Sequence, residues 1–167
     1  MSTLNNPTAT VVANAAVVSA DPANGDVSVF TYNSTDVIID VNGYFAASAP
    51  GGYSLYPVTP CRVLDTRQNN GQPFIGERTV NIAASPCALP GNTTGYVFNA
   101  TVVPSGFLGY LTLWPDTERQ PVVSTLNAYD GLITSNMAIV PNLNGSIDAY
   151  ASQLTQLILD ISGFFAP

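Results

Sequence analysis

The sequence predicts an all-β protein: an antiparallel β-sandwich, Greek-key-like, built from repeated hairpins. Three observations support this prediction. Apolar segments are short, about four to eight residues, and then meet a turn. Thirteen Gly and 13 Pro interrupt them. No segment has a clear helical period, and the longest apolar runs fall far below the ~18 residues of a membrane span, so we expect no membrane insertion.

The expected strands follow from the local patterns in order. Residues 26–32 alternate between the two faces of a strand, and residues 146–150 repeat that alternation. Residues 37–39 and 157–159 are continuous apolar runs, which is typical of strands covered on both faces. An Asn-Gly pair, the strongest short hairpin signal, precedes both alternating strands, at Asn24-Gly25 and Asn144-Gly145.

The chain contains an internal repeat, because residues 2–46 match residues 124–166. The offset is 122 at first and 120 after a loop. We interpret residues 2–46 as the C-terminal half of a preceding repeat unit, 47–52 as a linker and 53–167 as a complete unit that packs with 2–46. The matched segments are Ser2–Asn5 with Ser124–Asn127, Asn14–Val18 with Asn136–Val140, and Asp36–Phe45 with Gln156–Phe165.

A third segment, residues 99–114, has the pattern of residues 14–30 and 136–150. Each begins with Asn and small residues, continues with two β-branched or aliphatic residues and a turn, and ends in an alternating strand. Three related hairpins suggest an alternative to the sandwich, a threefold β-prism or β-trefoil. Repeats of this kind belong to arrays and surface proteins more often than to single enzymes.

Charge is scarce: charged residues are 9% of the chain, against about 25% in ordinary domains. The net charge of −7 argues against partners that are nucleic acids or anionic membranes. The chain has no His and no Lys, which excludes His-based relays, His metal sites and Schiff bases. We therefore expect no enzyme activity, no cofactor and no resident metal.

Only a carboxylate mechanism remains open to an enzyme of this composition. Asp40 and Asp160 occupy equivalent places in the two copies, and two acids can form a glycosidase pair. Each, however, belongs to its own repeat and is followed closely by Asn42-Gly43 or Ser162-Gly163. The sequence therefore favours a turn-capping role for both acids.

The two cysteines, Cys61 and Cys87, each follow a proline just outside a strand-like run. In a chain of secreted character, a disulfide is favoured over two buried thiols. Between them lies the densest charged cluster, and in it Arg62, Asp65 and Arg67 are expected to form a structural ion pair that holds a strand to its turn. By alternation, Asp65 and Arg67 share a face and Arg62 lies opposite. An Arg/Asp site for sugar or carboxylate is the alternative.

The string Pro60-Cys61-Arg62-Val63-Leu64-Asp65-Thr66-Arg67, followed by Gly76-Glu77-Arg78, resembles a repeat of large secreted and cell-surface proteins of soil and environmental bacteria. Those repeats likewise carry a Gly-Tyr-Leu-Thr strand, here 109–112, and end in strings like residues 39–45 and 159–165. The resemblance covers 53–167 as one unit and 2–46 as the tail of another. It implies an extracellular context and no catalytic residues.

Two further sites are candidates. Trp114, with Tyr110 on the same predicted strand, suits stacking on a sugar ring, although core packing is the commoner fate of such residues. Asp21, Asn24 and Asp26 offer oxygen ligands to Ca²⁺, but the spacing is not that of an EF-hand and a solvated turn is favoured.

The sequence therefore predicts a non-enzymatic, extracellular structural or adhesive repeat module. Its expected partners are further copies of itself or neighbouring repeats, joined through strand edges into a filament or surface layer. A carbohydrate-binding module with polysaccharide as its partner is the alternative function.

Overall fold

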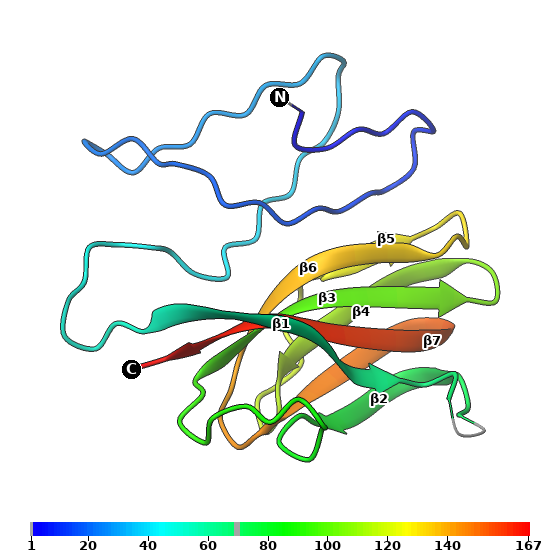
Figure 1. Cartoon of the computed structure of the whole chain (residues 1–167). Coiled ribbons are helices and arrows are strands. Elements are labelled where there is room, and N and C mark those ends of the chain that lie inside the picture. Colours follow the sequence, from blue (N-terminus) through cyan, green and yellow to red (C-terminus); the bar gives the residue numbers. More distant parts are fainter. Residues whose placement is uncertain (1, 69–70) are drawn as a thin grey trace.

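The protein is all-β, as predicted. The computed structural model describes residues 2–68 and 71–167, and this part of the chain contains seven strands and no helix, so none that could cross a membrane (Figure 1). All strand pairings are antiparallel, and the sheet closes into a nearly barrel-shaped structure. The strands are β1 Ser54–Asp65, β2 Phe74–Asn81, β3 Gly95–Pro104, β4 Leu108–Pro115, β5 Leu126–Ala128, β6 Thr134–Pro141 and β7 Ser146–Ala166.

The sheet is organised around β7, which is 21 residues long. The half of β7 formed by residues 146–155 pairs with β2 and β4, and the half formed by residues 155–166 pairs with β1 and β3. β5 and β6 extend the sheet beyond β4 and β3, which gives the order β5-β4-β7-β3-β6 (Figure 1). Four of the other six strands therefore depend on β7 for backbone hydrogen bonds.

Alternate residues of β7 supply the centre of the core, as the two-residue period of a strand requires. Their side chains are buried in both halves of the strand: Ile147, Ala149 and Ala151 in the first, and Leu157, Leu159 and Ile161 in the second. Fully buried residues of the neighbouring strands pack in the same cluster, including Phe98, Val102, Leu111 and Leu126.

The predicted hairpins do not form. β3 pairs with β6 and β7, β4 pairs with β5 and β7, and β6 pairs with β3, so the tight turns after β3 and β6 join strands that pair elsewhere. The turn before β7 is instead bound to the end of β2, because the Gly145 carbonyl accepts the N–H groups of Ile82 and Ala83. The threefold alternative is therefore wrong, since it needs three self-paired hairpins.

Residues 2–52 contain no strand, although alternation predicts one at 26–32 and a continuous apolar run predicts another at 37–39. The segment forms an extended excursion beside β5 and β6 (Figure 1). It contacts the sheet through the Ala15 N–H, which donates to Asn136 Oδ1 at 2.9 Å, and through the rings of Phe45 and Phe165, with centroids 6.1 Å apart. All seven strands lie within residues 54–166.

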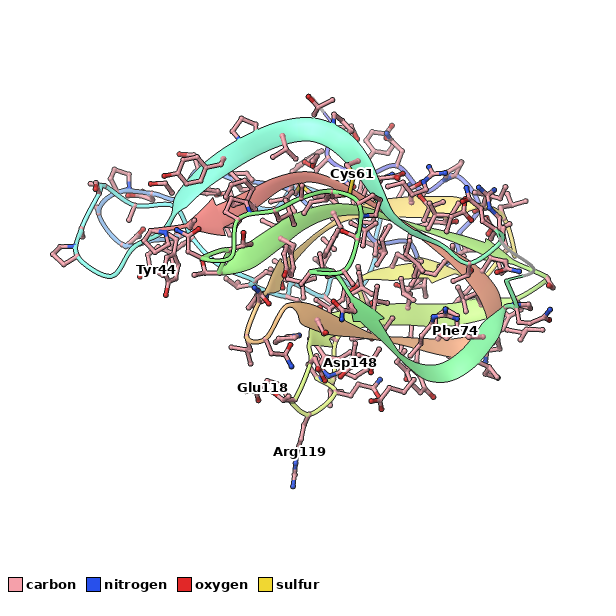
Figure 2. The ribbon with its side chains drawn as sticks, turned by 60° about the horizontal axis from the view of Figure 1, so that its bottom comes forward. Tyr44, Cys61, Phe74, Glu118, Arg119 and Asp148 are labelled. Atoms are coloured by element: carbon pink, nitrogen blue, oxygen red, sulfur yellow. A yellow bond between two sulfur atoms is a disulfide. The ribbon has the colours of Figure 1, made fainter. Side chains whose placement is uncertain are left out.

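The predicted disulfide between Cys61 and Cys87 is present (Figure 2). It joins β1 to the segment between β2 and β3, which otherwise has no strand of its own to hold it. Both cysteines are partly buried against the hydrophobic core. The bond therefore ties β1 to the segment between β2 and β3.

Loss of the disulfide is expected to lower the free energy of unfolding by about 3 kcal/mol, because a loop of this size gains that much entropy when it is released in the unfolded chain. The double variant Cys61→Ser/Cys87→Ser should show a lower midpoint of urea denaturation than the parent. Reduction of the parent should reproduce the shift, and the same reductant should leave the double variant unchanged. A midpoint that stays at the parent value in the double variant and in the reduced parent would contradict the prediction.

Candidate functional site

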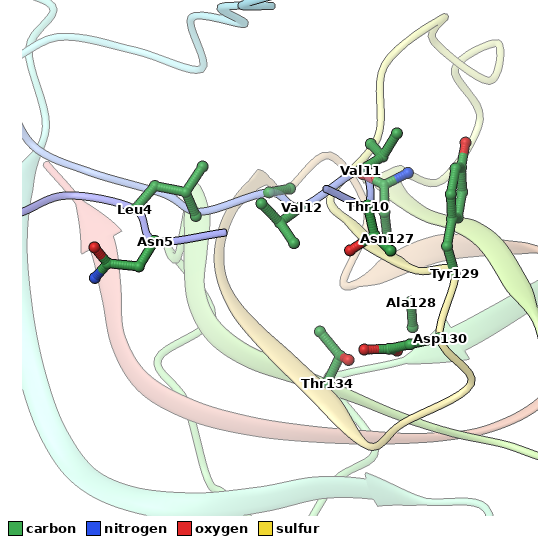
Figure 3. A pocket seen from close by; sticks show the side chains of 11 residues that line it. Leu4, Asn5, Thr10, Val11, Val12, Asn127, Ala128, Tyr129, Asp130 and Thr134 are labelled. Carbon is green, nitrogen blue, oxygen red and sulfur yellow. The ribbon is translucent and has the colours of Figure 1, made fainter. Parts of the chain in front are cut away.

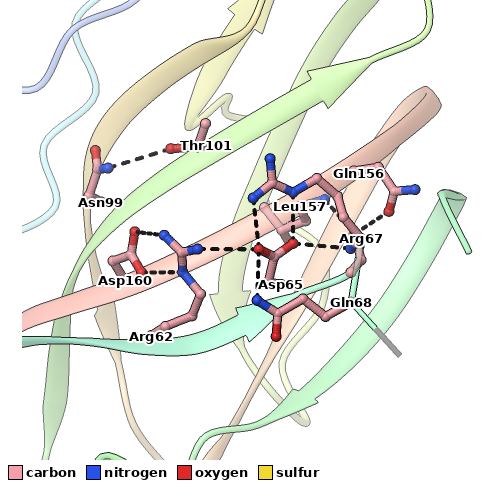
Figure 4. A network of polar contacts seen from close by, with 10 residues as sticks. Arg62, Asp65, Arg67, Gln68, Asn99, Thr101, Gln156, Leu157 and Asp160 are labelled. Atoms are coloured by element: carbon pink, nitrogen blue, oxygen red, sulfur yellow. Dashed lines mark hydrogen bonds and ion pairs between the residues drawn. The ribbon is translucent and has the colours of Figure 1, made fainter. Parts of the chain in front are cut away.

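The charged cluster predicted from the sequence forms one polar network where the end of β1 lies on β7 (Figure 4). Arg62 binds Asp160 through two bonds: Nε donates to Oδ1 at 2.8 Å and Nη2 to Oδ2 at 3.0 Å. Its third group, Nη1, donates to Asp65 Oδ2 at 3.2 Å. Arg62 therefore ties an acid of β1 to an acid of β7.

Asp65 is held from a second side by Arg67. The Arg67 side chain donates from Nε to Oδ1 at 2.9 Å and from Nη2 to Oδ2 at 2.8 Å, and its backbone N–H donates to Oδ1 at 3.1 Å. The Asp65 side chain is only 2% exposed, because the two half-exposed guanidinium groups cover it. The Arg67 hydrogen bonds are the main cause that lowers the pKa of Asp65 to about 2.

A register shift explains why three residues of β1 and its turn converge. Simple alternation places Arg62 and Asp65 on opposite faces, and this expectation is wrong. The pairing with β7 is interrupted between Arg62 and Leu64, where β1 contains an extra residue. Such a bulge moves the following side chains to the other face, and Asp65 comes to lie on the Arg62 side.

The same segment is also held by neutral groups that the sequence did not single out. Thr66 Oγ1 donates to Gln156 Oε1 at 2.5 Å and accepts the N–H of Leu157 at 2.8 Å. The Thr66 N–H donates to the Leu157 carbonyl at 3.0 Å. Arg62 and Thr66 therefore attach the end of β1 to β7, while Arg67 and Arg62 hold Asp65 in place beside them.

Asp160 does not cap a turn, because it lies within β7, opposite Arg62 of β1. Both of its carboxylate oxygens accept bonds from the guanidinium. Its counterpart in the first copy, Asp40, has no side-chain hydrogen bond or ion pair among the described residues. The sequence did contain a signal for the Asp160 role: an acid stands at the same position of an apolar run in both copies, which favours a cation opposite it.

The chemistry of this network favours a structural role over catalysis or ligand binding. Its two carboxylates already accept charged hydrogen bonds, so neither is available as a base or a nucleophile. Within residues 2–68 and 71–167, no group of three or more His, Cys, Asp or Glu side chains is arranged to hold a metal ion. Of the remaining arginines, Arg78 lies over the Phe74 ring, and Arg119 projects away from the sheet (Figure 2).

The proposed sugar platform is not on the surface. Trp114 is 3% exposed, and its indole N–H donates to the Glu118 carbonyl at 3.1 Å. Tyr110 is half-buried and stacks on Tyr150, with ring centroids 5.6 Å apart. Burial leaves no polar atom of the Trp114 side chain unsatisfied, because its one hydrogen-bond donor, the indole N–H, binds the Glu118 carbonyl.

The weak Ca²⁺ candidate is an internally bonded turn. Asp21 Oδ1 accepts the Ala23 N–H at 2.7 Å, and Asn24 Nδ2 donates to Asp26 Oδ2 at 2.7 Å. Asn24 Oδ1 in turn accepts the Asp26 N–H at 3.0 Å. These bonds are those of an Asx turn, and they account for the three side chains without an ion.

One pocket lies between the N-terminal segment and the sheet (Figure 3). One wall comes from residues 4–5 and 10–13, and the other from residues 127–130 and Thr134 at the β5–β6 edge. Its lining mixes short polar side chains with Leu4, Val11 and Val12, and carries one acid, Asp130. This composition is that of a contact between two chain segments rather than a site with converging catalytic groups.

The chain matched no protein-family model, no curated protein and no solved structure in the comparisons made. Its function is therefore inferred from its own residues and their arrangement.

Stability is expected to fall in acid through Asp65. Its folded pKa of about 2 lies below the ordinary value of 3.8, so the ion pairs stabilise the fold fully above about pH 4, and this contribution is lost as the pH falls through about 2. Asp65→Asn should lower the free energy of unfolding by about 1–2 kcal/mol at neutral pH. The difference between parent and variant should close between about pH 4 and pH 2 in denaturation curves.

The exposed Asp36→Asn variant is the control, because it removes a carboxylate outside the network. It should follow the parent at every pH. Parallel curves for the parent and Asp65→Asn would contradict the assignment of the acid sensitivity to this group.

Asp40 and Asp160 form a matched pair for testing the network. Asp160→Asn should destabilise the protein by about 1 kcal/mol, because a bidentate pair at a partly exposed site is lost. Asp40→Asn should stay within about 0.5 kcal/mol of the parent. Thermal denaturation measures both, and equal losses would show that Arg62 is not what distinguishes the two acids.

Proposed function

We propose that this chain is a non-enzymatic, extracellular structural or adhesive repeat module of a bacterial surface, which self-associates through its strand edges into a filament or surface layer. The observation that carries the proposal is the exposed apolar surface of residues 2–46. The large apolar side chains exposed there are Leu4, Val11, Val17, Val18, Val27, Val29, Phe30, Tyr32, Val37, Ile38, Ile39, Val41, Tyr44 and Phe45. So many exposed apolar side chains in one segment are characteristic of a surface that is covered by a partner.

The sheet itself offers edges to such a partner. β6 pairs with β3 on one side only, and β5 pairs with β4 on one side only. β6 carries no charged residue. Proteins that remain monomeric usually protect such edges with charged side chains, above all lysine, and this chain has none. An uncharged edge beside an apolar segment therefore supports association.

The extracellular part of the proposal is supported by the disulfide between Cys61 and Cys87, since such bonds persist in oxidising compartments. The scarcity of charge and the resemblance of residues 60–67 to repeats of secreted proteins point the same way.

A structural role is favoured over the carbohydrate-binding alternative by the placement of the aromatic residues. Trp114, the strongest candidate for a sugar platform, is buried, and Tyr110 is covered on one face by Tyr150. A non-enzymatic role is favoured by the absence of His and Lys and by the engagement of Asp65 and Asp160 with arginine. These features leave association as the activity best supported by the surface.

The proposal is tested by the size of the purified, non-reduced chain, measured by light scattering together with electron microscopy. We expect large oligomers or regular filaments. The variant Phe30→Ser/Ile38→Ser removes two side chains that are each 88% exposed, and it should shift the population to monomers while the β circular dichroism spectrum is retained.

Val122→Ser is the matched control, because Val122 is fully exposed but lies outside residues 2–46. It should assemble like the parent. A parent that stays monomeric at high concentration, or assembly that survives Phe30→Ser/Ile38→Ser unchanged, would overturn the proposal.

A further inference from the structure

Residues 2–46 already contain the local bonds of residues 124–166, although they contain no strand. Asn14 Nδ2 donates to the Thr3 carbonyl at 2.7 Å, and Asn136 Nδ2 donates to the Thr125 carbonyl at 2.8 Å. Equivalent bonds at the same places are Ser2 Oγ to Asn5 Oδ1 and Ser124 Oγ to Asn127 Oδ1, and the N–H of Asp26 to Asn24 Oδ1 and of Ser146 to Asn144 Oδ1. The two copies therefore specify the same turns.

The copies differ in what surrounds them. Five of the apolar residues exposed in 26–46 are the counterparts of the residues by which β7 fills the core. Each of the five is at least 47% exposed, whereas its counterpart is fully buried at 0%. The pairs are Val27 for Ile147, Val29 for Ala149, Val37 for Leu157, Ile39 for Leu159 and Val41 for Ile161. The first copy thus presents a β7-type face with nothing packed on it.

Gly43 gives independent support. Its counterpart Gly163 lies in β7 opposite Pro57 of β1, and a Cβ there would lie 3.1 Å from the Tyr56 carbonyl oxygen. At Gly43 an added Cβ would have no atom within 4 Å. Its backbone is also not in the left-handed region that favours glycine. Nothing in the present surroundings of Gly43 requires glycine, but a β1-type strand lying against it would.

Asp40 points to the same missing neighbour. In β7 the equivalent Asp160 receives two hydrogen bonds from Arg62 of β1. Asp40 lies between Ile39 and Val41 in an apolar run, where an acid is unfavourable in a sheet unless a cation faces it. The partner that suits Asp40 therefore carries an arginine at the Arg62 position.

We propose that residues 26–46 are a β7-type strand whose partner is a set of four strands of the β1–β4 type, supplied by an adjoining repeat of the same protein. The strands β1–β4 within residues 54–115 do not fill this role, because β7 already pairs with all four. A second copy of the chain offers no free β1–β4 set either, because its own β7 occupies it, and only its strand edges remain for association. The inference rests on the repeat architecture in the proposed function but not on filament formation.

The test supplies the partner in the same chain. A copy of residues 53–123 is joined in front of Ser2, as Val123 precedes Ser124, so that the intact chain is extended by a second β1–β4 set. Hydrogen–deuterium exchange is then followed by mass spectrometry in the original and extended chains. We expect amides of 26–46 to exchange at least about 100-fold more slowly in the extended chain, approaching the rates of 146–166.

Variants make the test specific to the proposed pairing. In the extended chain, Gly43→Val and Asp40→Asn should return residues 26–46 to faster exchange, whereas both should be silent in the original chain. Asp36→Asn is the matched control on the same strand, because its counterpart Gln156 is uncharged. It should leave the protection in place.

Exchange of residues 26–46 that is as fast in the extended chain as in the original, with residues 146–166 still protected, overturns the inference. Protection that is unaffected by Gly43→Val also overturns it, because the strand would then be seated in another register. The size measurement on the original chain reports on assembly alone. If the original chain is a monomer while residues 26–46 are protected in the extended chain, filament formation is refuted and this pairing is supported.

Discussion

The structure depends on one constraint, the pairing of β7 with four strands at once. β7 is paired on both backbone edges in each of its halves, by β2 and β4 in the first and by β1 and β3 in the second. Since its alternate side chains also form the centre of the core, β7 contributes hydrogen bonds and apolar burial together. All four partners are distant in sequence, so the strand gains its stability only when the whole unit has folded.

The Arg62–Asp65–Arg67–Asp160 network and the disulfide act on the strand that needs them most. β1 pairs with β7 alone, through a register broken in two places, and most of its side chains are at least partly exposed. Its hold on β7 through backbone and burial is therefore weak. Arg62 and the Thr66 bonds attach its end to β7, while Cys61 attaches its middle to the segment before β3. The distinctive sequence of residues 60–67 thus has a structural explanation: its cysteine, arginines, aspartate and threonine hold β1 in place.

The sequence was sufficient for features set by local pattern and composition: the all-β class, the disulfide and the contact of Asp65 with both arginines. It was insufficient wherever the answer depended on distant partners. Asn144-Gly145 specifies a turn, but packing decides whether the two strands joined by that turn pair with each other. β6 and β7 do not, so the prediction of hairpins was wrong. The bulge after Arg62 has no signature in the residue pattern, and it reversed the expected face. For Trp114 core packing was the favoured expectation over a sugar contact, and the residue is buried, although alternation alone gives a strand two faces without saying which is covered.

The two copies of the repeat separate local from non-local causes within one molecule. Matching residues form the same turns at 2–46 and 124–166, but the strand forms only where β1–β4 are present. The magnitudes explain why. A surface ion pair such as that of Asp160 contributes about 1 kcal/mol at most, whereas burial of each Val, Leu or Ile side chain contributes about 2 kcal/mol. The exposed apolar side chains of residues 26–46 therefore determine whether this segment forms a strand. Asp40 and Gly43 then determine the register of that strand and the partner strands that suit it.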